Sequence, residues 1–141
     1  MRTPYSPLVD MRKTALTNHE HKMMQNTFAI NQTQGKIDAL NAEIAMIRFP
    51  ESGEYSAYKA ISYTKNTLLL ELDSLLGELA NLKAQTKALQ EEYRVLNIEY
   101  EKMQYLETRE MERKMKKQKK SQQRANDEMS ILLYSKKGGI L

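Results

Sequence analysis

The side chains best suited to chemistry in this chain are its histidines and its paired carboxylates. His19 and His21 are the only two histidines, and two imidazoles could share a metal ion or move protons. On a helix, however, side chains two residues apart point to different faces. Glu91 and Glu92 could act as an acid–base pair, but adjacent carboxylates on a helix are ordinary surface charges. We therefore expect neither a metal site nor an acid–base site.

Other catalytic arrangements are also missing from the sequence. The chain has no Cys, which excludes a disulfide framework, a thiolate zinc site and a Cys nucleophile. It has no glycine-rich phosphate loop and no Ser–His–Asp candidate, and a thin helical protein has no interior for a substrate cleft. We therefore predict that the protein is not an enzyme and binds no cofactor or small-molecule ligand, so that its function depends on its surfaces.

The elements that must position these surfaces are long helices. The 141 residues include 5 Gly, 3 Pro and no Trp, and good helix formers dominate. Ser6 suits an N-cap and Pro7 the first helical position, whereas the segment 49–54 is the strongest internal break. Gly138 and Gly139 suit a helix end. We predict one domain with helices over about 7–48 and 55–135, a turn over about 49–54 and a tail over 136–141.

Both predicted helices carry an apolar heptad repeat. In the first, apolar side chains recur every seven residues at Val9, Leu16, Met23, Ile30, Ile37 and Ile44. In the second, a stripe spaced by four and three residues runs from Leu68 to Met103. Such a period is typical of coiled coils. The fold class is therefore predicted to be all-α, a long antiparallel two-helix coiled-coil hairpin with an extended C-terminal helix.

The predicted register follows from the lengths of the two stripes. If the chain reverses near residue 51, facing residues have numbers that sum to roughly 103. The stripe of the second helix then ends at Met103, and the next seam positions, Glu107 and Glu110, have no first helix to cover them. The polar seam residues His19 and Asn26 are predicted to fix the register.

Three surfaces are candidates for partner binding. The first is the aromatic cluster near the turn, where Tyr58, Ile61, Tyr63 and Leu68 are the predicted contact residues. The second is the basic segment 113–124, which has seven cations and no acid, whereas the rest of the chain sums to −3. The third is the apolar C-terminal end, which includes Met129 and Leu132. The alternatives are that the rings cap the hairpin and that the basic segment is simply a solvated helix.

The C-terminal segment also contains a second stripe. Residues spaced by four and three are Met111, Met115, Gln118, Gln122, Ala125, Met129 and Leu132. This stripe is out of phase with the one that ends at Met103, as after a stutter. Because the first helix cannot reach it, we expect an adaptable, methionine-containing binding face there. The residues predicted to bind a partner through the basic segment and the apolar C-terminal end are Arg113, Lys116, Lys117, Lys119, Lys120, Met129 and Leu132.

The sequence resembles the FliJ family of flagellar type III export proteins. Family members open with an aromatic residue, spaced aliphatics and an arginine, which Tyr5, Leu8, Val9, Met11 and Arg12 match. They end with a charged helix, an Asp-Glu pair and apolar residues, which Lys116 to Lys120 and Asp127 to Ile131 match. A further family pattern, Tyr followed by Phe and an aliphatic, is matched only in part, because Tyr58 is followed by Ile61 and Lys65.

The resemblance implies a non-enzymatic stalk or chaperone component. Its partners would be an export ATPase hexamer (FliI-like) and an export gate (FlhA-like), and it would lie at the cytoplasmic face of the inner membrane. The lack of an apolar signal core and of an 18-residue apolar run also favours a cytoplasmic protein that is at most peripheral to the membrane.

Three alternatives to this function stay open. They are an injectisome-type secretion stalk, a generic coiled-coil scaffold, and a basic arm that binds nucleic acid. The basic segment 113–124 has no aromatic side chain for base stacking, so no nucleic acid is expected.

Overall fold

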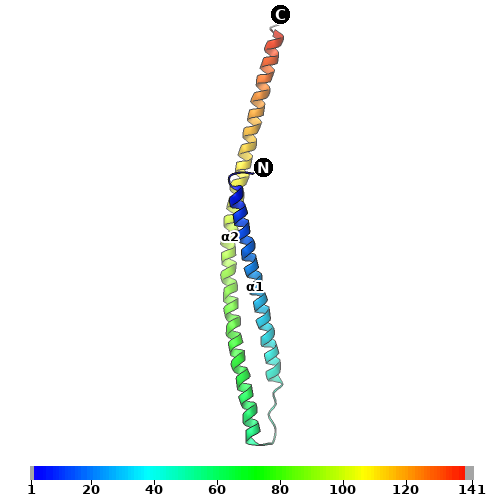
Figure 1. Ribbon diagram of the computed structural model, residues 1–141, viewed down its shortest axis with the longest axis vertical. Coiled ribbons are helices and arrows are strands. Elements are labelled where there is room, and N and C mark those ends of the chain that lie inside the picture. Colours follow the sequence, from blue (N-terminus) through cyan, green and yellow to red (C-terminus); the bar gives the residue numbers. More distant parts are fainter. Residues whose placement is uncertain (1, 139–141) are drawn as a thin grey trace. The chain divides into compact units, whose positions relative to one another are not determined.

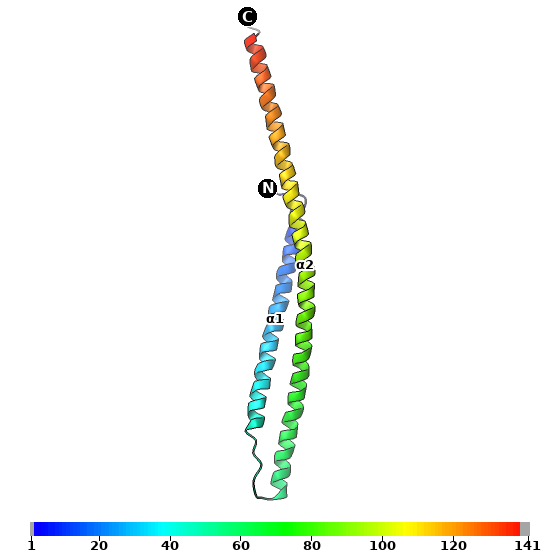
Figure 2. The same ribbon diagram turned by 180° about the vertical axis from the view of Figure 1, so that it is seen from behind.

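The structure, a computed structural model, describes residues 2–138, with side chains up to Lys136. Helix α1 spans Ser6–Ala45 and helix α2 spans Tyr55–Gly138, and no strand occurs among the described residues. Figures 1 and 2 show α1 beside α2 and running in the opposite direction. The prediction of an all-α antiparallel hairpin is therefore confirmed.

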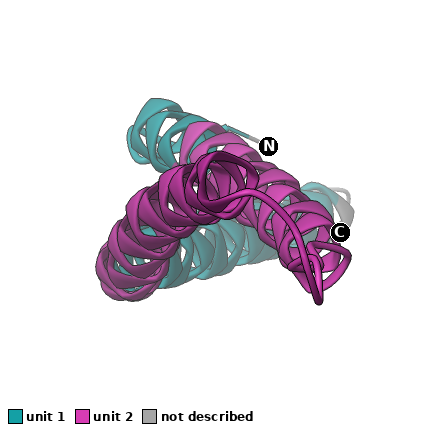
Figure 3. Cartoon of the chain, turned by 90° about the horizontal axis from the view of Figure 1, so that it is seen from below, with its two compact units in different colours: residues 1–15, 96–141 teal, residues 16–95 magenta. Residues whose placement is uncertain are grey.

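The chain divides into two compact units, coloured separately in Figure 3. Unit 1 comprises residues 1–15 and 96–141, so it joins the start of α1 to the C-terminal half of α2. Unit 2 comprises residues 16–95 and holds the rest of α1 with the first half of α2. Each unit thus contains a stretch of both helices.

Burial in unit 2 follows the predicted heptad spacing. Leu16, Ile37 and Leu40 of α1 and Leu79 and Leu89 of α2 form the buried apolar core. The other seam positions are buried or half-buried, namely His19, Met23, Asn26, Ile30, Thr33 and Ile44 of α1 and Ile61, Lys65, Leu68, Leu72, Leu75, Leu82, Thr86 and Tyr93 of α2. A two-helix seam is one side chain thick, which explains why many of its apolar residues keep some exposure.

The observed register differs from the predicted sum of roughly 103. The numbers of contacting residues sum to 108 for His19 and Leu89 and to 112 for Asn26 and Thr86. The cause is the connection between the helices, because Phe49 packs on Tyr58, whose ring lies 4.9 Å away. The connection therefore runs along the first turns of α2. Non-helical backbone advances further per residue than a helix does, which moves the reversal point toward higher numbers.

The end of α1 also differs from the predicted one. The helix ends at Ala45, before Arg48. Its last turn tightens, because the Ile47 amide donates to the Ile44 carbonyl and the Met46 amide is shared between the Ala42 and Glu43 carbonyls. Hydrogen bonds between residues three apart in the sequence are typical of a helix terminus. Pro50 also disfavours a helical conformation for the residue before it.

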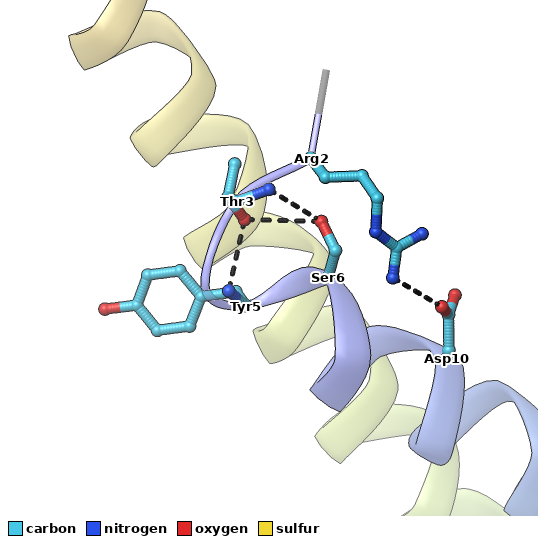
Figure 4. Close-up of polar contacts among 5 residues, drawn as sticks. All are labelled: Arg2, Thr3, Tyr5, Ser6 and Asp10. Carbon is cyan, nitrogen blue, oxygen red and sulfur yellow. Dashed lines mark hydrogen bonds and ion pairs between the residues drawn. The ribbon is translucent and has the colours of Figure 1, made fainter.

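The start of α1 is capped by Thr3 rather than by the predicted Ser6 (Figure 4). The Thr3 hydroxyl accepts a hydrogen bond from the Tyr5 amide at 3.2 Å, and the Ser6 hydroxyl accepts one from the Thr3 amide at 2.9 Å. This reciprocal pair is a capping box in which Ser6 takes the place usual for Glu. Arg2 also pairs with Asp10 at 3.2 Å. These contacts fix residues 2–6 within unit 1, where Thr3 and Ser6 are buried.

This N-terminal cap lengthens the seam of α2 beyond the predicted end at Met103. The half-buried residues of α2 continue with Leu106, Glu107, Glu110, Met111 and Lys114. With the observed register, Glu107 falls opposite the first residues of the chain, next to the N-terminus of α1. A carboxylate is favoured at that end of a helix dipole, which gives a physical reason for acids in these seam positions. Met111, predicted to be uncovered, is therefore partly covered.

Candidate interaction surfaces

The buried histidine of unit 2 is held by α2. His19 is 5% exposed, and its Nε2 lies 2.7 Å from the Leu89 carbonyl oxygen. A carbonyl only accepts hydrogen bonds, so Nε2 carries the proton and donates. The other ring nitrogen, Nδ1, lies 3.8 Å from the carboxylate of Glu92. His19 thus acts within the seam, as a group that fixes register.

Asn26 forms the second polar layer of unit 2. Its Nδ2 donates to the Thr86 hydroxyl at 2.5 Å and to the Leu82 carbonyl at 3.4 Å. Its Oδ1 is buried and has no hydrogen-bond partner among the described residues. The unpaired Oδ1 costs stability. The Nδ2 group, however, reaches both of its acceptors in only one alignment of the two helices, so Asn26 favours that register. The predicted register role of both polar residues agrees with these contacts.

Two exposed hydrogen-bonded contacts beside the seam shift the pKa values of Tyr93 and Glu91. The Tyr93 hydroxyl donates to the Glu20 carboxylate at 3.3 Å, and this hydrogen bond, with the negative charge of Glu20, raises the pKa of Tyr93. The guanidinium of Arg94 binds Glu91 at 2.7 Å, and this hydrogen bond and charge lower the pKa of Glu91. Glu91 is therefore a paired surface carboxylate in this structure.

The predicted turn-proximal site residues do not share one exposed face. Tyr63 is 74% exposed, whereas Ile61 and Leu68 are half-buried seam residues. Tyr58 is half exposed and packs on Phe49, and the Lys65 ammonium lies 5.5 Å from the centre of the Phe49 ring. Tyr58 thus also stabilises the connection between the helices, as the capping alternative stated.

Sequence reasoning missed several exposed apolar residues on the first half of α2. Leu69, Leu70 and Leu76 are 39%, 70% and 46% exposed. Tyr55, which the sequence already placed in the aromatic cluster near the turn, is exposed as well. They fall outside the Leu68–Leu72–Leu75 seam row, so the heptad pattern itself could have identified them. Leu69 and Leu76, seven residues apart, lie on a row that flanks the seam, whereas Tyr63 and Leu70, also seven residues apart, lie on the side of α2 away from it. We name Tyr55, Tyr63, Leu69, Leu70 and Leu76 the turn-proximal surface.

Unit 1 has a hollow of mixed charge where α1 begins. Its volume is 560 Å³, and its lining consists of Tyr5, Leu106, the cations Arg109, Arg113 and Lys116 and the carboxylates Glu110 and Glu112. Arg113 pairs with Glu110 at 3.0 Å, and Arg109 lies over the Tyr105 ring at 5.8 Å. Farther toward the turn, Arg12 of α1 pairs with Glu99 of α2 at 2.7 Å. The hollow lies where Tyr5, just before α1, approaches α2.

The remainder of α2, residues 115–136, is exposed at every position. We name it the distal segment. It contains the predicted cations Lys116, Lys117, Lys119 and Lys120 and the apolar residues Met129 and Leu132, which are 61% and 66% exposed. The structure thus places these site residues on one uncovered helical stretch, directly after Arg113.

Residues 2–138 contain no group of three or more His, Asp or Glu side chains that could hold a metal ion. Within the same part of the chain, neither helix has an apolar stretch long enough to cross a bilayer.

Comparison with known proteins gave one match. A family model described as "Flagellar FliJ protein" matches residues 1–139. No curated protein and no solved structure matches the chain.

Proposed function

Because the chain belongs to the flagellar FliJ family, whose function is connected with flagellar protein export, we propose that it is a stalk component of the type III export apparatus. It engages an export ATPase ring through the distal segment. It engages an export gate through the first turns of α2, where Tyr58 and Tyr63 lie. It acts by contact, without chemistry of its own, at the cytoplasmic face of the inner membrane.

The observation that carries this proposal is the uncovered distal segment of α2. It is a single helix of 22 residues that nothing in the described chain covers, and it spans roughly 33 Å at 1.5 Å per residue. With side chains such a helix is about 10–12 Å wide, which suits the centre of a ring. Its cations favour an acidic ring entrance, and its uncharged stripe offers Met115 and Met129 for an adaptable contact.

ATPase stimulation tests the ring contact. Replacing Lys116, Lys117, Lys119 and Lys120 with Gln removes four charges and keeps helix propensity. We expect less stimulation of the cognate ATPase, mostly at low salt, because charges are screened within about 10 Å at 0.1 M. Removing residues 129–141 should abolish stimulation at any salt. If both variants stimulate like the intact chain, the protein is a passive scaffold rather than a stalk.

The gate contact is tested most cleanly at Tyr63. Tyr63 is exposed and touches neither Phe49 nor the seam, whereas Tyr58 packs on Phe49. Tyr63→Ala should therefore weaken gate binding about tenfold or more, as expected for an aromatic anchor, with an unchanged melting temperature. Tyr58→Ala should lower both affinity and melting temperature. Unchanged affinity in Tyr63→Ala would remove this ring from the interface.

The alternatives make different predictions. An injectisome-type stalk would bind the ATPase of that system in preference to the flagellar one. A scaffold would leave every ATPase rate unchanged. A nucleic-acid-binding arm would bind arbitrary RNA or DNA with strong salt dependence.

A further inference from the structure

The cations that begin at Arg113 are not spread evenly around α2. Arg113, Lys117, Lys120 and Arg124 are spaced by four, three and four residues. Side chains at this spacing lie in one row along a helix, and this row is about 16 Å long at 1.5 Å per residue. Arg113 pairs with Glu110, whereas Lys117, Lys120 and Arg124 form no ion pair within the described residues.

The same row continues into apolar residues. Asp127, Ile131 and Tyr134 follow Arg124 at spacings of three, four and three residues. Ile131 is 67% and Tyr134 is 82% exposed. Four cations are therefore followed, on the same face of α2, by two acids, Asp127 and Glu128, an aliphatic side chain and an aromatic one.

The opposite face of this stretch has no charge along its central row. That row contains Met115, Gln118, Gln122, Ala125 and Met129. At 3.6 residues per turn, Gln122 lies about half a turn away from Lys120 and Arg124. A partner that binds the uncharged row thus leaves the cationic row free for a second partner.

We propose that the cationic row of α2, with Ile131 and Tyr134, binds the surface of an anionic lipid bilayer. Lysine and arginine are attracted to acidic headgroups and contribute to binding roughly additively. Tyrosine prefers the interface between headgroups and acyl chains, and an adjacent aliphatic residue adds buried apolar area. Asp127 and Glu128 oppose this attraction, but both lie at the C-terminal end of the row, and four cations precede them.

A bilayer fits this face better than nucleic acid does. Bases bind through stacking on aromatic side chains that lie among the cations, and residues 113–124 include none. Here the aromatic residue follows the cations at the end of the row, where it would enter the interface while the cations contact headgroups. The cationic row shares Lys117 and Lys120 with the proposed ring contact. Vesicle binding is therefore measured with the chain alone, without ATPase, so that its failure and the failure of the ring contact are distinguishable.

Co-sedimentation of the full chain with vesicles tests the proposal. We expect binding to vesicles of phosphatidylglycerol and phosphatidylcholine, and little binding to phosphatidylcholine alone. Lys117→Gln with Lys120→Gln should weaken binding by about 25-fold, since each cation near the surface contributes about fivefold. Ile131→Ser with Tyr134→Ser should also weaken binding, and this loss should persist at high salt.

Matched variants decide whether the row itself is the site. Lys114→Gln with Lys119→Gln removes the same charge from positions beside the uncharged row, and Met129→Ser with Leu133→Ser removes apolar area there. Both should reduce vesicle binding much less than the row variants do. Equal losses would show that only the total charge matters and would overturn the assignment of this face. Stronger binding to a single-stranded RNA than to anionic vesicles would overturn the choice of lipid.

Discussion

Two stretches of α2 have similar helical propensity but different surroundings. From Ile61 to Lys114, one side of the helix is covered, and its burial repeats every three or four residues. From Met115 to Lys136, every residue is exposed, although the Met and Leu spacing continues. An apolar stripe therefore becomes a core only where another segment of the chain reaches it, and elsewhere it is available to partners.

The largest expected difference between the two stretches concerns core truncation. Ile37 is 3% exposed and packs against the covered stretch, so Ile37→Ala should lower the free energy of unfolding by about 2 kcal/mol or more. Ile131→Ala, in the distal segment, should change it by less than about 0.5 kcal/mol. Thermal and urea unfolding followed by circular dichroism would measure both. A similar loss in both variants would show that the distal segment is packed in solution.

Asn26 provides a test of opposite sign. Asn26→Leu removes the unpaired Oδ1 and leaves the Thr86 hydroxyl bonded to the Leu82 carbonyl. We expect the free energy of unfolding to rise by about 1 kcal/mol, with a less defined register. The register is measured by disulfide trapping of Cys pairs introduced into the Cys-free chain. A loss of stability would mean that the polar layer stabilises the fold as well as aligning it.

The N-terminal cap determines where coverage of α2 ends. Thr3→Ala removes the hydroxyl that accepts from the Tyr5 amide and should cost about 1 kcal/mol. Hydrogen exchange should then increase around Glu107 and Met111, because the segment that covers them is released. Thr14→Ala, at an exposed position of α1, is the matched control and should change neither quantity. Unaltered exchange in Thr3→Ala would show that these residues are protected without the cap.

The smallest expected effect is the pH dependence of the Tyr93–Glu20 contact. The folded state raises the pKa of Tyr93, so the protonated hydroxyl favours folding below the ordinary tyrosine pKa of about 10. This contribution disappears as the pH rises through the raised folded pKa. The melting temperature of Tyr93→Phe should thus lie slightly below that of the unchanged chain at pH 8, with the difference decreasing as the pH rises above the ordinary tyrosine pKa of about 10. A constant difference across this range would exclude the contact.

The sequence by itself determined the helical hairpin and most of its seam. Heptad spacing is a local property of each helix, so Leu16, Ile37, Leu79 and Leu89 were identifiable without coordinates. The same holds for the basic segment, because seven cations without an acid cannot be buried in a thin seam. The residues of the turn-proximal surface were also within reach, since they fall between seam positions.

Only the tertiary structure decided the register and the limits of coverage. The register depends on the path of residues 46–54 along α2, and heptad spacing carries no information about a non-helical connection. The cap by Thr3 depends on hydrogen bonds among Thr3, Tyr5 and Ser6, whereas the sequence pattern predicted Ser6 as the cap. Because that cap places the first residues of the chain beside Glu107, it also decides where the covered part of α2 ends and the free surface begins.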